Sequence, residues 1–197
     1  MIAGPSEVLI ISDGKPPIKT IAADLLAQLE HDREAMAVLL TTSKMEAEAL
    51  ESELISQAKS LSRAEDVLSA LSLNTFVIRC DSVAEMVCIA NQVAPEHLEW
   101  LVSGNDDSID MIVNAGALFI GPYTPEALGD SLAEPNHTLP TTGTAKFSSP
   151  LGVYHFQKRL NYLYYGREAF ESAAAHVIKF AEKEGLDAHG KSIEIRL

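Results

Sequence analysis

The sequence predicts an α/β fold: an incomplete Rossmann-like, mainly parallel sheet flanked by helices, with a small helical C-terminal extension. The first observation is a series of short apolar runs bounded by turn residues, which are typical of buried strands. These runs are residues 8–11, 36–40, 76–78, 98–102 and 117–120. The second observation is that segments with helical spacing separate most of the runs. Strands that alternate with helices indicate an open, parallel α/β sheet.

The helices expected between the strands have one apolar face. In the first of them, Ile21, Leu25 and Leu29 recur at the spacing that places side chains on one side of a helix. A later helix has a capping residue at Asp81 or Ser82. The expected helices are residues 18–30, 45–71 with a break near 60–62, 82–92 and 108–113.

The composition changes after Thr124. Residues 124–149 are rich in Pro, Gly, Thr and Ser and predict one long ordered loop. Long loops in compact domains are usually functional.

Helical patterns return in the last part of the chain. From Val153 onward, helical spacing places Phe156, Leu160, Leu163 and Tyr164 on one side. Further helices are expected at residues 170–184, with Gly185 as the C-cap, and at residues 186–197. We therefore expect a partial α/β domain, residues 1–150, that carries the candidate site, and a helical tail, residues 151–197.

The composition excludes several classes of protein. Of 197 residues, 47% are hydrophobic and 22% charged, as in a soluble globular protein. The net charge of −13 argues against sequence-independent nucleic-acid binding, which needs a basic surface. No apolar run has the length of a membrane span and no signal peptide precedes the first strand, so we expect a cytoplasmic protein without a membrane partner. Cys80 and Cys88 are expected to be buried, reduced thiols, too few for a cysteine zinc site.

A carboxylate and an imidazole stand side by side after a proline. The run is Ala94-Pro95-Glu96-His97-Leu98-Glu99. Proline fixes its own φ and restricts the residue before it, so this run is a rigid entry into a new element. A His exchanges protons near neutral pH, and a neighbouring carboxylate tunes its pKa or activates a water. The alternative is an ordinary strand start with two solvated polar groups.

Two further pairs have the side chains of metal ligands. Gln28 and His31 stand three residues apart at the end of a helix, and Asp130 and His137 lie in the long loop. The alternatives are a His that interacts with the helix dipole and ordinary turn chemistry. The residues alone indicate an α/β protein with a candidate His/Asp/Gln metal site and no more.

Two other polar residues are open to both interpretations. The hydroxyl of Ser6 either faces a ligand or belongs to a turn, and His189 near the C-terminus is either functional or only solvated. No nucleophile motif and no Gly-x-Gly-x-x-Gly dinucleotide fingerprint occurs anywhere in the chain.

Taken together, these segments resemble the histidinol dehydrogenase family over the whole chain. The segments that carry the resemblance, in order, are Ala3-Gly4-Pro5-Ser6-Glu7-Val8-Leu9, Ala22-Ala23-Asp24-Leu25-Leu26-Ala27-Gln28-Leu29-Glu30-His31-Asp32, Ala94 to Glu99, Asn114-Ala115-Gly116-Ala117-Leu118-Phe119-Ile120-Gly121, Glu126-Ala127-Leu128-Gly129-Asp130, Asn136-His137-Thr138-Leu139-Pro140-Thr141, Phe147-Ser148-Ser149 and Glu184-Gly185-Leu186-Asp187-Ala188-His189.

The resemblance implies a reaction and a set of site residues. The family oxidises L-histidinol through histidinaldehyde to L-histidine, with one zinc ion per site and two NAD⁺, in the last steps of histidine biosynthesis. It implies zinc ligands at Gln28, His31, Asp130 and His189, which would also contact substrate. His97 would be the general base and a substrate contact, and Glu96 would activate water. Ser6, His137 and Glu184 would contact substrate, and the tail of a homodimer would bring Glu184 and His189 to the partner's site.

The resemblance covers about the later half of the family's length. Met1 matches an internal position, so we expect a truncated chain whose NAD-contacting residues belong to the preceding half. The family usually has an aromatic residue after Asp130, where this chain has Ser131, and Leu132-Ala133-Glu134-Pro135 is also unusual. Two alternatives follow: a non-catalytic remnant that binds zinc or dimerises, and an enzyme for a different amino alcohol.

Overall fold

The computed structural model describes residues 4–104, 107–133 and 136–197. Ala3 of the first shared segment, and Glu134 and Pro135, lie outside the described residues. The chain divides into two compact units, residues 1–155 and 156–197.

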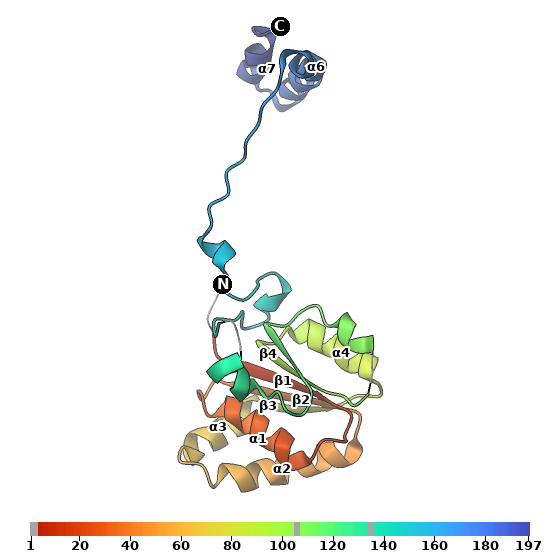
Figure 1. Ribbon diagram of the computed structural model, residues 1–197, viewed down its shortest axis with the longest axis vertical. Helices are drawn as coiled ribbons and strands as arrows, with labels where there is room; N and C mark the ends of the chain where they lie inside the picture. Colours follow the sequence, from red (N-terminus) through yellow and green to blue (C-terminus); the bar gives the residue numbers. More distant parts are fainter. Residues whose placement is uncertain (1–3, 105–106, 134–135) are drawn as a thin grey trace. The chain divides into compact units, whose positions relative to one another are not determined.

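The first unit is built on a sheet of five parallel strands in the order β3-β2-β1-β4-β5 (Figure 1). The strands are β1 (Glu7–Ser12), β2 (Met36–Thr41), β3 (Thr75–Arg79), β4 (His97–Leu101) and β5 (Ala117–Ile120). The predicted parallel α/β fold is therefore confirmed. The order also places β4 beside β1, with Val8 opposite His97, so two segments distant in sequence begin side by side.

Helices cover both faces of the sheet (Figure 1). One face packs against α1 (Ile18–Leu29), α2 (Lys44–Ala58) and α3 (Ala64–Asn74), with a core that includes Val8, Ile10, Leu25, Leu39 and Leu50. The other face packs against α4 (Val83–Val93), with a core that includes Leu9, Ile11, Met86, Leu98 and Trp100. The short helix expected at 108–113 is a 3₁₀ turn, η1 (Asp107–Met111).

Helix boundaries follow local capping chemistry. The predicted break near residues 60–62 is confirmed, because α2 ends at Ala58 and α3 begins at Ala64. The predicted cap of α4 is Ser82, whose hydroxyl accepts from the N–H of Glu85 at 3.2 Å. The Glu85 carboxylate in turn accepts from the N–H of Asp81 at 2.7 Å, close to the reciprocal pattern of a capping box.

The segment 124–149 is more ordered than a single loop. It contains α5 (Glu126–Leu128), a π-helical turn η2 (Gly129–Ala133) and a 3₁₀ turn η3 (Thr144–Lys146). Pro125 precedes the first turn, where its missing N–H costs no hydrogen bond. This short helical stretch places Glu126 and Asp130 four residues apart on a common side.

Two expectations are wrong. The helix expected from Val153 onward is only the 3₁₀ turn η4 (Val153–Phe156), followed by extended chain to Gly166. Its four large side chains are all at least 77% exposed: Phe156, Leu160, Leu163 and Tyr164. A short amphipathic helix is marginal in water unless a surface covers its apolar face. Cys88 is exposed rather than buried, because it faces outward from α4, whereas Cys80 is buried as expected.

The second unit pairs two helices. They are α6 (Arg167–Glu184) and α7 (Asp187–Glu194), as the sequence predicts. Gly185 has a φ of +70° and ends α6, a backbone conformation that favours glycine. Among the described residues, no helix is long and apolar enough to cross a bilayer.

Candidate active site

The candidate site begins where β1 and β4 begin, at the amino edge of the sheet. Ala94 ends α4 with a φ of +55°, Pro95 follows, and Glu96 and His97 enter β4 with 6% and 1% of their surface exposed. Gly116 permits the close approach of β5, because a Cβ there would lie 2.5 Å from the carbonyl oxygen of Glu96. The alternative of two solvated polar groups is wrong, since both side chains are buried.

His97 is held in one orientation. Its Nδ1 lies 3.2 Å from the carbonyl oxygen of Glu7, which can only accept, so Nδ1 carries the proton in the neutral ring. Its Nε2 is buried without a hydrogen bond of good geometry, 3.3 Å from a carboxylate oxygen of Asp130. Burial lowers the pKa of His97, and the charge of Asp130 opposes that shift. The imidazole is therefore neutral near pH 7, with Nε2 able to accept a proton.

Glu96 is tuned towards neutral pH. Burial raises the pKa of Glu96 to about 7, against hydrogen bonds from the N–H of Glu7 and the hydroxyl of Ser6 that lower it. The charges of Glu7 and Asp130 raise it further. A carboxyl with a pKa near the working pH can take a proton from water and return it.

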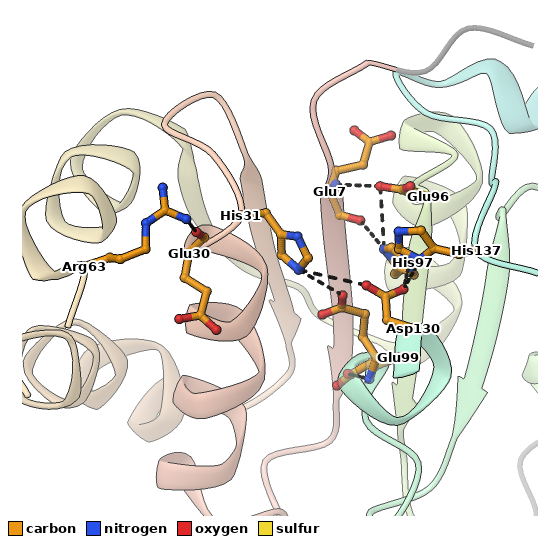
Figure 2. Close-up of polar contacts among 10 residues, drawn as sticks. Glu7, Glu30, His31, Arg63, Glu96, His97, Glu99, Asp130 and His137 are labelled. Atoms are coloured by element: carbon orange, nitrogen blue, oxygen red, sulfur yellow. Dashed lines mark hydrogen bonds and ion pairs between the residues drawn. The ribbon is translucent and has the colours of Figure 1, made fainter. Parts of the chain in front are cut away.

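Asp130 lies among three imidazoles (Figure 2). Its carboxylate oxygens lie 3.0 Å from Nδ1 of His137, 3.3 Å from Nε2 of His97 and 3.9 Å from Nε2 of His31. These four residues come from α1, β4 and two parts of the 124–149 segment. The structure thus brings together side chains that the sequence singled out separately.

Glu126 joins this group, although the sequence analysis gave it no role. It is 1% exposed, and its Oε1 lies 4.0 Å from Nε2 of His31. Ligand atoms of His31, Glu126 and Asp130 all lie within 4.8 Å of one another. The available signal was the spacing of Glu126 and Asp130, which places both on one side of a helical turn.

The unpaired polar atoms fit a metal ion. Gln28 is fully buried on α1, and neither atom of its amide has a hydrogen-bond partner. Buried polar groups are normally paired, so such atoms indicate a missing polar group or ion. Tetrahedral ligands about 2.0–2.1 Å from zinc lie roughly 3.4 Å apart, and imidazole nitrogen and carboxylate oxygen are its usual donors. The separations of His31, Asp130 and Glu126 are close to that value and close further with small movements.

A second carboxyl pair lies behind the site. Oε1 of Glu99 accepts from the N–H of Glu126 at 2.8 Å, and the Glu99 carboxyl also meets that of Asp24 on α1. Burial raises the pKa of both, and two carboxyls bond to each other only when one is protonated. The pair therefore shares a proton and holds the start of α5. Nothing in the local sequence shows this pairing, which depends on α1 packing against β4.

Two predicted residues, Glu184 and His189, belong to the second unit. Both are exposed, on α6 and α7. They line a groove of about 330 Å³ between these helices, whose lining is His176, Val177, Phe180, Ala181, Glu184 and His189.

The fold and the site define an α/β protein whose parallel sheet carries an acid–base pair and a metal-type cluster at its amino edge. The sequence model of the histidinol dehydrogenase family matches residues 1–197, and the chain belongs to that family. It is 48% identical to the histidinol dehydrogenase of Clostridium acetobutylicum and 46% identical to that of Oceanobacillus iheyensis, each over 196 residues.

A solved structure has the same fold. The crystal structure of histidinol dehydrogenase from Elizabethkingia anophelis matches with a TM-score of 0.87 and 33% identity, over 100% of this chain and 45% of that one. The two curated relatives are likewise covered over 46% of their length. The chain thus spans about half the length of the relatives that it matches.

Proposed function

We propose that this chain carries the zinc- and substrate-binding part of a histidinol dehydrogenase. The reaction is the oxidation of L-histidinol through histidinaldehyde to L-histidine, with reduction of two NAD⁺. The observation that supports it best is the group of three imidazoles around Asp130 beside the buried Glu96–His97 pair.

The zinc ligands would be Gln28, His31, Asp130 and His189. Two unpaired amide atoms and the close approach of His31 to Asp130 support the first three. Glu126 lies near enough to be an alternative carboxylate ligand or to orient His31. When bound, zinc would fix the amine and imidazole nitrogens of the substrate and polarise its alcohol oxygen.

His97 would be the base for both oxidations. Its Nε2 takes the alcohol proton while the carbon-bound hydrogen leaves with its electron pair for the nicotinamide ring of NAD⁺. The carbonyl of Glu7 holds the other ring proton on Nδ1 and stabilises the imidazolium that forms. The neutral state of His97, set by burial, is the state that this step needs.

Glu96 would act between the two oxidations. Its carboxylate takes a proton from water, whose oxygen attacks the aldehyde carbon and forms a hydrated aldehyde. That hydrate loses a second hydride to a second NAD⁺ and becomes the carboxylate of histidine. The raised pKa of Glu96 suits this proton transfer near neutral pH.

The remaining residues would bind substrate. Ser6 lies beside Glu96, and His137 lies beside Asp130. We further propose a cytoplasmic homodimer in which Glu184 and His189 of the tail complete the partner's site. Residues that contact NAD⁺ are expected in the half of the relatives that this chain does not match.

The decisive experiment is to purify the chain, load it with zinc and measure L-histidinol-dependent formation of NADH. The His155→Ala variant is a matched control, because His155 is exposed on the 3₁₀ turn η4. Turnover that is lost in His97→Asn but kept in His155→Ala supports the proposal. If the folded, zinc-loaded chain stays inactive after the unmatched half of a relative is added, the proposed function is wrong.

A further inference from the structure

Glu7 lies between the two candidate catalytic side chains, although the proposed reaction gives it no role. It is the first residue of β1 and is 6% exposed. Figure 2 shows both of its main-chain groups in use: its N–H donates to Oε2 of Glu96 at 3.1 Å, and its carbonyl accepts from Nδ1 of His97 at 3.2 Å. One residue therefore orients both groups.

The contact between Glu7 and Glu96 runs in both directions. The Glu96 carboxylate accepts from the N–H of Glu7, and the main-chain N–H of Glu96 bonds to the Glu7 carboxylate and lowers its pKa. Each residue thus uses its side chain to fix the main chain of the other. This arrangement stands just before the ladder of β1 and β4, which begins at Val8 and His97.

The Glu7 carboxylate also holds a strained turn. Its Oε1 accepts from the N–H of Thr142 at 2.8 Å, and the N–H of Gly143 bonds to the same carboxylate. Thr142 has a φ of +55° and Gly143 a φ of +70°. A β-branched residue in the left-handed region persists only where surrounding contacts hold it.

This turn anchors the segment that carries His137. Thr141 Oγ1 accepts from the N–H of Gly4 at 2.8 Å, and the hydroxyl of Thr144 donates to the carbonyl of Thr141 at 2.6 Å. Four residues before Thr141, the ring of His137 meets Asp130 at 3.0 Å. The Glu7 carboxylate therefore lies at one end of the stretch that presents a substrate-binding side chain.

We propose that Glu7 is a positioning residue, which joins Glu96, His97 and the turn 141–144 into one hydrogen-bonded unit. Through this unit the base, the water-activating carboxylate and His137 keep fixed positions relative to one another. The inference rests on the proposed function where it treats these groups as catalytic or substrate-binding.

Two substitutions test the unit. Glu7→Gln keeps the volume and one acceptor but turns an amide NH₂ towards N–H donors that need an acceptor. Glu7→Ala removes the side-chain contacts altogether. Glu34→Gln is the matched control, because it removes the same charge from an exposed position.

The first measurement is NMR on the isotope-labelled chain and needs no activity. In the unchanged chain, the ring nitrogens of His97 should report a proton on Nδ1. In Glu7→Gln, the Thr142 amide should exchange at least about tenfold faster, since a charge-assisted bond is lost, and the His97 ring should become a mixture of tautomers. Glu34→Gln should match the unchanged chain. Unaltered Thr142 exchange and an unaltered His97 tautomer in Glu7→Gln would overturn the inference, whether or not Glu7→Ala folds.

The second measurement separates this inference from the proposed function. In a preparation that turns over L-histidinol, Glu7→Gln should lower kcat by roughly 10–100-fold, as expected for a misplaced base, and Glu34→Gln should not. Full activity in Glu7→Gln would refute the positioning role. NMR changes in a chain with no turnover even after the unmatched half is added would refute the proposed function and support the hydrogen-bonded unit.

Discussion

At the scale of single residues, surroundings give chemically identical side chains different properties. His97 is buried, neutral and fixed by the carbonyl of Glu7, whereas His155 is exposed. The sequence predicts the Glu96–His97 pair because proline and acid–base side chains stand together. It does not show Glu7 or Glu99, since their importance depends on which strands lie side by side.

We expect His97→Asn to lower the rate of histidinol oxidation by about 10²–10⁴-fold, because the variant lacks a base at the position of Nε2. Zinc content should stay unchanged, since His97 is not a proposed ligand. Steady-state rates and metal analysis of the same preparation check both statements. A variant with normal rates would remove His97 from its role as base.

The proposed ligands on α1 can be tested without activity. Gln28→Ala or His31→Ala should weaken zinc binding by at least about tenfold, because each removes a donor atom. Zinc titration by calorimetry measures this change, with His155→Ala as the control. Equal affinity in all three variants would show that the metal, if bound, lies elsewhere.

At the scale of elements, local sequence determines most boundaries and fails where burial decides. The strands, the break between α2 and α3 and the cap of α4 all follow from periodicity and turn chemistry. The helix expected from Val153 onward does not form, since its apolar residues are exposed in this chain. Periodicity shows that a face could be buried, and only the tertiary structure shows whether it is.

The cap of α4 allows a quantitative prediction. Ser82→Ala should lower the free energy of unfolding by about 1 kcal/mol, because the N–H of Glu85 loses its acceptor. Urea unfolding followed by circular dichroism measures the change. The control is Ser52→Ala, at an exposed position inside α2, which should change stability by less than about 0.5 kcal/mol. Equal losses in the two variants would contradict the capping role.

At the scale of the whole molecule, an acidic layer is buried between the sheet and its helices. Burial raises the pKa of Glu96 to about 7 and that of Glu126 to about 8, and it also raises the pKa of Glu99 and Asp24. These residues come from α1, β4 and α5, so the layer exists only once the fold is complete. This is why the sequence predicts the sheet well and the composition of the layer poorly.

This layer predicts that the metal-free chain becomes less stable as the pH rises. Glu99 keeps its proton in the folded state well above the model value of 4.5 at which the unfolded chain loses it. Between that value and about pH 8 the folded state binds more protons, so the free energy of unfolding falls as the pH rises.

Urea midpoints at pH 5 and pH 8 measure the effect. Glu99→Gln should flatten the dependence, because the amide carries no proton that can be lost, while Glu34→Gln should leave it as it is. A chain that is more stable at pH 8 than at pH 5 would contradict the buried acidic layer.

The edge of the sheet that holds the site has an electrostatic sign of its own. In a parallel sheet the connecting helices run against the strands, so α1 ends at the same edge where β1 and β4 begin. A helix C-terminus carries partial negative charge from its unpaired carbonyls, which favours cations. Gln28 and His31 stand at that end of α1. The peptide dipoles of α1 therefore add to the carboxylates in attracting a positively charged ion, whereas the opposite edge, where helices begin, has the sign that favours phosphate groups.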